Sequence, residues 1–236
     1  MLTTEADQKI RIRNLFARIA LHYDRVNHII SLGQDQHWRA VALDMAELSS
    51  GARLLDVATG TGDMAIMARE IDPEIWVVGT DLTPAMLIQA QKKAYHQPLP
   101  WVIGDGLALA FTKDSFDAVI SAFMMRNVPD VTQALREQLR VVRPGGRVVC
   151  LEMTWPQWFP MNWLFKSYFY SLPPLLGHFI SGDKQAYRYL PRSVEKFLTP
   201  KEMAAAMKKV GLSQVSWRLL MLGTVAIHTG VKLMKT

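Results

Sequence analysis

The residues best suited to chemistry surround a glycine turn that follows an apolar run at 54–57. Gly60 and Gly62 allow backbone N–H groups to approach a ligand closely where a side chain would block it. The next apolar run, 76–80, is closed by Asp81, and an acid at the end of that strand is well placed to hold a ribose diol. This combination predicts a pocket for a nucleoside-containing cofactor.

Two cofactor classes use such a turn. The dinucleotide fingerprint is Gly-x-Gly-x-x-Gly/Ala after a strand, with an acid about 20 residues further on. Gly60, Gly62, Ala65 and Asp81 satisfy it, so a nicotinamide or flavin enzyme stays open on this match alone. A plain reading, in which the glycines only make a tight strand-to-helix connection, also stays open.

The distribution of acids favours the other class. Asp56 lies inside the strand end, where a carboxylate can accept hydrogen bonds from the ammonium group of S-adenosylmethionine and would repel a pyrophosphate. Asp63 adds negative charge, and no Arg or Lys stands in the turn to offset it, although this acid also suits the first turn of a helix. Asp105, on the loop after 101–103, can take the adenine amino group. Three acids at successive strand ends predict S-adenosylmethionine as the cofactor.

The composition indicates one compact α/β domain. The chain has 236 residues, of which 50% are hydrophobic, so it can bury a substantial core. The formal charge is +6. No dense basic run with interleaved aromatic residues indicates a nucleic-acid groove, so we expect no nucleic-acid partner. A mild attraction to anionic lipid head groups explains the charge as well, and it predicts transient contact with a membrane surface.

Cysteine, histidine and terminal patterns bear on the compartment. The one cysteine, Cys150, lies in an apolar run, which predicts a buried strand residue and excludes a disulfide within the chain. The six histidines show no metal-ligand spacing, so no metal is expected. Charge throughout the first 20 residues and the lack of a spanning stretch predict a cytoplasmic protein, at most peripheral on the inner face of the membrane.

Short apolar runs alternate with helical patterns from position 52 onwards. This alternation predicts a doubly wound, mostly parallel sheet with helices on both faces. The expected strands are 52–58, 75–80, 100–104, 116–123 and 146–152, and the expected helices between them are 63–71, 84–94 (with Thr83 as N-cap) and 130–141. Two helices should precede the sheet, one carrying the periodic apolar residues Ile12, Leu15, Phe16, Ile19 and Tyr23 and one covering 34–48.

The segment 155–180 is rich in Trp, Tyr and Phe, and Lys166 is its only formal charge. Prolines should break it into short pieces, which argues against a membrane span. Plain core packing, a lid over an apolar substrate and an interfacial anchor all stay open. The four prolines are Pro156, Pro160, Pro173 and Pro174.

The C-terminal part predicts two more helices and a hairpin. Thr199 as N-cap, Pro200 at the first helical position and Gly211 as stop define the second helix. The expected helices are 183–197 and 200–210, and the expected strands of the hairpin are 213–221 and 223–231.

Taken together, these motifs resemble those of class I S-adenosylmethionine-dependent methyltransferases. The series comprises 56–63, 81–87, Asp105, 116–119 and 140–146. The resemblance implies a seven-stranded sheet whose last strand inserts antiparallel, in a single domain over 1–236. Its expected parts are an N-terminal helical cap at 1–50, a cofactor-binding core at 51–153, a substrate lid at 154–199 and a C-terminal helix and hairpin at 200–236.

A narrower resemblance is to the quinone-biosynthesis C-methyltransferases. It rests on the Arg-Asn-Val signature in 121–128, on Glu152, on Tyr23-Asp24 and on 183–190. One departure is Ala58-Thr59, where that family usually has a small residue followed by glycine. The resemblance implies methyl transfer to the ring carbon of a reduced polyprenyl quinol, either demethylmenaquinol or the benzoquinol precursor of ubiquinone. A phenolic acceptor, a phospholipid amine and a nicotinamide-dependent oxidoreductase are the alternatives, and a homodimer stays open.

The resemblance also implies roles for individual residues. Arg126 and Asn127 would orient the quinol oxygens, while Tyr23 and Asp24 would close the site from the N-terminal helices. The general base is left open among Asp24, His178 and Tyr187. The cofactor would be held by Asp56 and Asp63 at its amino-acid head group, Gly60, Thr61 and Gly62 in the loop, Asp81 with Leu82 at the ribose, Asp105 and Gly106 at the adenine, and Ser121 near the reacting centre.

Overall fold

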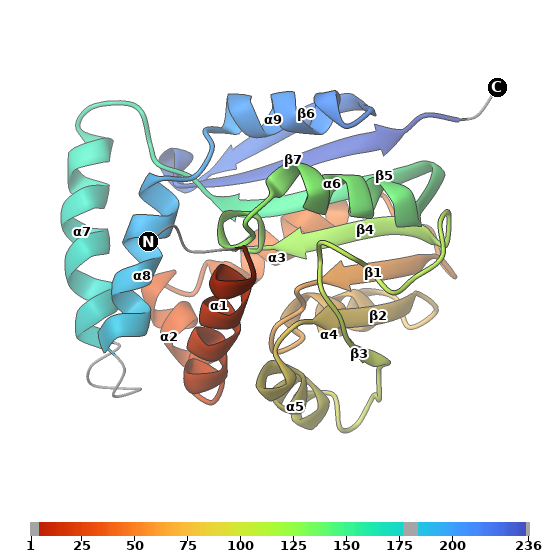
Figure 1. Ribbon diagram of the computed structural model, residues 1–236, viewed down its shortest axis with the longest axis horizontal. Coiled ribbons are helices and arrows are strands. Elements are labelled where there is room, and N and C mark those ends of the chain that lie inside the picture. The colour runs from red at the N-terminus through yellow and green to blue at the C-terminus, as the bar shows by residue number, and fades with distance from the viewer. Residues whose placement is uncertain (1–4, 177–183, 235–236) are drawn as a thin grey trace.

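A computed structural model describes residues 5–176 and 184–234 of the chain (Figure 1). Its centre is a seven-stranded sheet in the order β3-β2-β1-β4-β5-β7-β6. The buried apolar runs of the sequence form its middle strands. The strands are β1 (Arg53–Val57), β2 (Trp76–Asp81), β3 (Trp101–Ile103), β4 (Phe116–Ala122), β5 (Val142–Met153), β6 (Leu212–Leu220) and β7 (Val225–Lys232).

The first five strands are parallel, and the hairpin at the end of the chain supplies the remaining two. β7 lies between β5 and β6 and is antiparallel to both. The strand order reverses between β1 and β4, and ligands bind outside the carboxyl ends of the strands at such a switch point. The doubly wound, mostly parallel sheet and its antiparallel insertion are therefore confirmed.

Helices cover both faces of this sheet. α3 (Asp35–Asp44) and α4 (Asp63–Ile71) pack their apolar sides on one face, with Trp38, Ala42 and Ala65 buried there. α6 (Val131–Val141) and α9 (Pro200–Lys209) cover the other face. Short apolar strands buried on both sides explain why these runs do not alternate with polar residues.

A third cluster of helices stands at the carboxyl ends of the strands, on the left of Figure 1. It contains α1 (Glu5–Ile19), α2 (Tyr23–Ile30), α7 (Met161–Leu176) and α8 (Lys184–Glu195). Buried Leu15, Val26, Phe165, Phe169 and Val194 hold these helices together. α5 (Pro84–Lys93) joins the cluster through buried Met86, so the helices border the edge where ligands bind.

Three differences between the expected and the observed element boundaries concern the N-terminal helices and β5. The periodic N-terminal segment is two helices, because α1 ends at Ile19 and Tyr23 begins α2. The helix expected over 34–48 is shorter at both ends, as Asp35–Asp44. β5 begins at Val142, earlier than the expected 146, because Val142 already pairs with Phe116 of β4 before an irregularity in the register.

The prediction that prolines break the aromatic segment into short pieces is wrong for Pro173 and Pro174. Both lie within α7 near its end, and both are buried. Each removes a backbone N–H donor, but both residues lie in the last turn of the helix, and their burial favours the folded arrangement. Along the described ranges, no helix combines the length and the apolar character that crossing a membrane requires.

Candidate active site

The glycine turn after β1 adopts left-handed backbone angles, which explains its composition. Gly60 has φ +57° and Gly62, the N-cap of α4, has φ +85°. A Cβ built on Gly60 would meet no atom within 4 Å, so the turn faces open space. Ala58 also lies in the left-handed region, at φ 55°, where a residue with a Cβ is strained.

Asp81 ties this turn to the end of β2. Its Oδ2 accepts the backbone N–H of Gly60 at 2.9 Å, and its Oδ1 accepts that of Thr83 at 2.7 Å. Thr83 is the N-cap residue of α5 but makes no side-chain cap, and the Asp81 carboxylate instead holds the backbone of Thr83 at the start of the helix. Burial raises the pKa of Asp81, and the two N–H donors oppose that rise.

A cavity lies beyond these residues at the carboxyl ends of β1, β2 and β4. It measures about 780 Å³, counted to where it opens to solvent. Several residues singled out in the sequence line its wall together, namely Tyr23, Gly60, Asp81, Leu82, Asp105, Gly106 and Asn127.

One wall of the cavity comes from α1, which sequence reasoning did not assign to the site. Lys9, Ile12, Arg13 and Phe16 line it from this helix. Lys9 Nζ donates to Asp105 Oδ2 at 2.7 Å and so joins α1 to the loop after β3. The apolar residues at helical spacing in 12–16 were the only indication in the sequence that this helix packs against the domain. Nothing in the sequence indicated that Lys9, one turn earlier, contacts the site.

Asp56 is buried beside the turn and does not line the cavity. Its Oδ2 accepts the Thr59 hydroxyl at 2.5 Å. Burial raises the pKa of Asp56 to about 7, and the Thr59 hydrogen bond and the charge of Arg39 oppose that rise. Thr59, which stands at the departure from the quinone-biosynthesis pattern, therefore holds this carboxylate in place.

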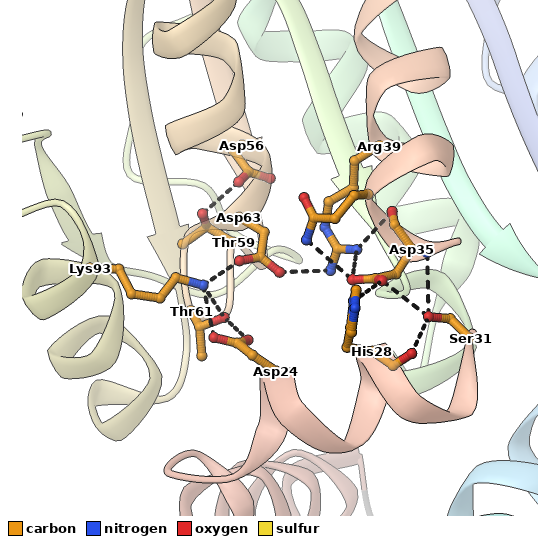
Figure 2. A network of polar contacts seen from close by, with 11 residues as sticks. Asp24, His28, Ser31, Asp35, Arg39, Asp56, Thr59, Thr61, Asp63 and Lys93 are labelled. Atoms are coloured by element: carbon orange, nitrogen blue, oxygen red, sulfur yellow. Dashed lines mark hydrogen bonds and ion pairs between the residues drawn. The ribbon is translucent and has the colours of Figure 1, made fainter. Parts of the chain in front are cut away.

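Asp63 is charge-balanced, although the sequence offered no cation in the turn. Arg39 Nη2 of α3 lies 3.2 Å from its Oδ2, and Lys93 at the end of α5 pairs with its Oδ1. Lys93 also reaches Asp24 at 2.8 Å, and Thr61 donates to the same aspartate. Figure 2 shows these side chains converging from four helices and the turn. The expectation of an uncompensated acid at this position is wrong, because the cations arrive from distant segments.

The position of Arg39 is set by a second layer of polar contacts (Figure 2). Its Nη1 donates to the Asp35 backbone carbonyl at 3.1 Å and to the Asp35 carboxylate at 3.3 Å. Ser31 and His28 contact that carboxylate, each at 3.0 Å. Because Arg39 is only 5% exposed, this layer provides the partners that a buried cation needs.

Ser121 lies away from the cavity, contrary to its expected place near the reacting centre. It is buried in β4, and its hydroxyl points to Cys150 Sγ at 3.6 Å. The alternation of side chains along the strand turns it into the core, while the next residue, Ala122, lines the cavity. Cys150 is a free, buried strand residue as predicted, and burial raises its pKa to about 12.

Arg126 lies beside the cavity in a short 3-10 helix, η1 (Met125–Asn127), directly after β4. Its side chain is 6% exposed and pairs with Glu152, which is buried at the end of β5. Glu152 also accepts the Arg126 backbone N–H at 3.2 Å. Within the described part of the chain, Nε of Arg126 is buried and has no hydrogen-bond partner.

Phe123 turns the chain from β4 into η1. Its φ of 58° is left-handed, and such strain in a residue with a side chain is characteristic of functional sites. The guanidinium groups of Arg39 and Arg126 lie 5.7 and 5.4 Å from its ring centroid, so two buried cations contact the same aromatic ring. This arrangement was not predictable from the sequence, because the contacts depend on how α3 and η1 pack against each other.

Asn127 and Tyr23 complete the border of the cavity. Asn127 Nδ2 donates to the Phe123 carbonyl at 2.8 Å, and its Oδ1 accepts the Tyr189 hydroxyl of α8 at 3.0 Å. The Nδ2 and Oδ1 atoms of Asn127 therefore each keep one further hydrogen-bonding position. Burial raises the pKa of the Tyr23 phenol, while the charges of Arg126 and Arg39 oppose that rise.

Of the three candidate general bases, the structure describes the side chain of Asp24 alone. Asp24 is engaged by Thr61 and Lys93. His178 lies outside the described residues, and for Tyr187 the structure describes the backbone of α8 but not the side chain. In the described ranges, no group of three or more His, Cys, Asp or Glu side chains could hold a metal ion.

The geometry fits S-adenosylmethionine. The open side of Gly60 gives room beside the turn, and Asp81 and Asp105 reach the cavity from neighbouring strand ends. The buried carboxylate of Asp56 stands behind the turn. These residues would hold the ribose, the adenine and the amino-acid head group. Arg39 and Lys93 balance the charge of Asp63, so the turn by itself does not exclude a pyrophosphate, and it is the acids at the strand ends that favour S-adenosylmethionine.

Comparison with known proteins supports this chemistry. The family model described as the ubiE/COQ5 methyltransferase family matches residues 3–232. A demethylmenaquinone methyltransferase of Thermus thermophilus is 44% identical, over 92% of this chain and 99% of its own. A ubiquinone/menaquinone biosynthesis C-methyltransferase, UbiE, of Paracoccus denitrificans is 36% identical, over 97% and 93%.

Among solved structures, the fold is shared with phosphoethanolamine N-methyltransferase 2 of Haemonchus contortus, in complex with phosphomonomethylethanolamine and S-adenosylhomocysteine. The TM-score is 0.65 at 15% identity, covering 86% of this chain and 53% of that one. The likeness to this solved structure concerns the fold alone. The family model, in contrast, matches nearly the whole length of the chain. The chain therefore belongs to the ubiE/COQ5 methyltransferase family and is an S-adenosylmethionine-dependent methyltransferase.

Proposed function

We propose that this protein transfers a methyl group from S-adenosylmethionine to a ring carbon of a reduced polyprenyl quinol. The acceptor is demethylmenaquinol or the benzoquinol precursor of ubiquinone. The names of the Thermus and Paracoccus relatives support a quinone precursor over another phenol or a phospholipid amine. Membership of a methyltransferase family also leaves a nicotinamide-dependent oxidoreductase without support.

The observation that carries this proposal is the buried Arg126 beside the cofactor cavity. Glu152 holds its guanidinium, and its Nε–H is without a partner in the described part of the protein. A buried donor without a partner is costly, and an oxygen of the acceptor would satisfy it. A quinol presents such an oxygen next to the ring carbon that receives the methyl group.

The bound cofactor supplies an electrophilic methyl group, because its sulfonium withdraws electrons. The residues of this chain must supply an electron-rich carbon, and a quinol ring gains that character when its hydroxyl loses a proton. Arg126 would stabilise the negative charge that develops on that oxygen. An oxidised quinone ring is electron-poor and should not react, so the reduced form is the substrate.

Asn127, Tyr23 and Asp24 would position the acceptor. The Tyr23 phenol, whose pKa is raised by burial, stays protonated at neutral pH and can donate to the second quinol oxygen. The second N–H of Asn127 would hydrogen-bond to the quinol and hold its ring in place. The other contacts of Asn127 are with Tyr189 and Phe123. Asp24 would hold the glycine turn closed through Thr61.

Cofactor contacts follow the wall of the cavity. Gly60 and Thr61 with Gly62 form the loop, and Asp81 with Leu82 binds the ribose. Asp105 and Gly106 receive the adenine, and release of Lys9 would free the Asp105 carboxylate for it. Asp56 and Asp63 act from behind the turn on the ammonium group. Ser121 supports the sheet beneath the reacting centre through its contact with Cys150.

The remaining expectations concern the surroundings of the enzyme. We propose that residues 154–199 act as a lid over the acceptor and that the protein works in the cytoplasm at the inner membrane surface, because a polyprenyl quinol resides in the bilayer. Trp163 and Phe159 are 61% and 82% exposed on or just before α7, which suits interfacial contact. We propose further that nucleic acid has no part in this function, and a homodimer stays open.

The test measures radiolabel transfer from S-adenosylmethionine to chemically reduced demethylmenaquinol in detergent micelles, with the oxidised quinone as control. Label should appear only with the quinol. Arg126→Ala should lower kcat by about 10²–10³, as removal of an oxyanion donor does, and Arg126→Lys should recover part of it. Turnover of Arg126→Ala within twofold of wild type contradicts the role of Arg126, and labelling of neither ring contradicts the acceptor.

A further inference from the structure

A second, wider cavity lies between α1 and α8, next to the active site. It measures about 1840 Å³, counted to its open mouth. η1 and the start of α6 form its inner wall, which Arg126 and Val128 line. Val128 also lines the cofactor cavity, so the two cavities adjoin at η1, next to Arg126.

The lining of this cavity is basic. Its charged residues are Arg11 and Arg18 on α1, Arg126, and Arg192 and Lys196 on and after α8, and no described acid lines it. Glu152 neutralises Arg126, and Arg18 has a contact of its own. Arg11, Arg192 and Lys196 are exposed and form no ion pair within the described ranges. Three positive charges thus face solvent at the mouth.

The floor of the cavity is apolar. Leu15, Met125, Val131, Phe197 and Leu198 line it. An apolar floor beneath a cationic mouth matches an amphipathic anion, whose charged group stays at the surface while its chains lie deeper. The three cations are exposed at the rim and do not enclose a small pocket, so they are less suited to a soluble phosphate ion.

We propose that Arg11, Arg192 and Lys196 bind the phosphate groups of anionic phospholipids and hold the mouth of this cavity against the membrane. The inference rests on the proposed function, because a lipid-soluble quinol has to pass from the bilayer to Arg126. The cavity then offers the quinol a path that starts among lipid head groups and ends at the reacting centre.

The test is sedimentation of the full-length protein with vesicles of phosphatidylcholine, with and without phosphatidylglycerol. Wild type should bind the anionic vesicles at low salt and be released at high salt. Each basic residue near an anionic surface contributes about fivefold to the partition coefficient, so the triple variant R11Q/R192Q/K196Q should bind roughly 100-fold more weakly.

The matched control is K201Q/K208Q/K209Q, which removes the same charge from exposed positions on α9. It should lose much less binding than the first variant. Equal losses in the two variants overturn the proposal, because they assign binding to net charge. Equal binding to neutral vesicles overturns it in favour of the aromatic face of α7. Release by inorganic phosphate at matched ionic strength overturns it in favour of a soluble anion.

The vesicle-binding assay and the methyl-transfer assay test the lipid site and the proposed acceptor separately. Binding is measured without cofactor or quinol, and methyl transfer by wild type is measured in micelles without anionic lipid. Loss of the lipid effect with turnover intact contradicts only the lipid site, whereas bound but inactive wild type contradicts the proposed acceptor. Thermal unfolding of each variant shows that it is folded, and the salt dependence of wild-type binding tests the proposal without any substitution.

Discussion

Asp56→Asn should make the protein more stable and a poorer binder of S-adenosylmethionine. Asp56 is 1% exposed, and burial raises its pKa from an ordinary 3.8 to about 7. The folded state therefore holds the proton more tightly than the unfolded chain. Stability contributed by the neutral acid is present below the unfolded pKa and is lost as pH rises towards the folded pKa.

The size of this effect follows from the two pKa values. They differ by about 3, and each pH unit corresponds to about 1.36 kcal/mol, so ionising Asp56 costs about 4 kcal/mol. Asparagine cannot ionise and can still accept the Thr59 hydroxyl. The free energy of unfolding of the variant should match that of wild type near about pH 4 and exceed it by up to about 4 kcal/mol near about pH 8.

Urea unfolding over this pH range measures the difference, and calorimetry on the same samples measures cofactor affinity. Glu152, whose pKa is also raised, is present in both proteins and cancels in the comparison. The charge of Asp81 helps to raise the pKa of Asp56, so the repulsion between these two acids is part of the measured difference. Asp44→Asn, at an exposed position in α3, is the control and should leave the pH dependence unchanged.

Two results would refute the reasoning. A variant that is less stable than wild type near about pH 8 would show that the ionised carboxylate does not lower the free energy of unfolding. An unchanged cofactor affinity at that pH would show that Asp56 does not act on the ammonium group. In wild type, affinity should strengthen as pH rises through about 7, because only the ionised form attracts a cation.

Three further substitutions test the surrounding structure. Glu152→Gln leaves the buried Arg126 without a counter-charge, so the free energy of unfolding should fall by about 3 kcal/mol in urea and methyl transfer should fall with it. Ala58→Gly relieves a left-handed φ and should raise the unfolding free energy by about 0.5–1 kcal/mol, while a fall would mean that the turn is unstrained. Thr199→Ala removes the hydroxyl that caps α9 in a capping box with Glu202. It should lower the thermal midpoint in line with about 1 kcal/mol, and Thr199→Ser should restore it.

The sheet and one edge of the site were predictable because they depend on local order. Each parallel strand ends at the same edge, so acids that follow successive strands must lie near one another. The register pairs Val57 with Thr80, next to Asp81, and Asp81 with Ile103, two residues before Asp105. Glycine in a strand-to-helix turn likewise has a local cause, which is the left-handed backbone at Gly60 and Gly62.

The partners of these residues were not predictable. Arg39 reaches Asp63 from α3, and Glu152 reaches Arg126 across 26 positions of sequence. Such pairs are decided by how helices pack on the sheet, and one sequence carries no signal of that packing. The same holds for Lys9, whose pairing with Asp105 brings α1 to the cavity over 96 positions.

The prediction for the prolines was wrong because it applied a local rule where tertiary structure also matters. The rule that proline ends a helix describes the loss of one N–H donor and a steric clash, both of which are local. Pro173 and Pro174 lie near the end of α7 and are buried. Burial is a tertiary contribution that the local rule does not include.

The antiparallel insertion of β7 has a consequence for synthesis on the ribosome. The chain emerges in sequence order, so β5 and β6 are made before the strand that separates them. Until Val225–Lys232 has been translated, β5 has an unpaired edge and β6 has no neighbour in the final sheet. Open strand edges promote aggregation, so the nascent protein depends on its last strand, or on a chaperone, to close the sheet.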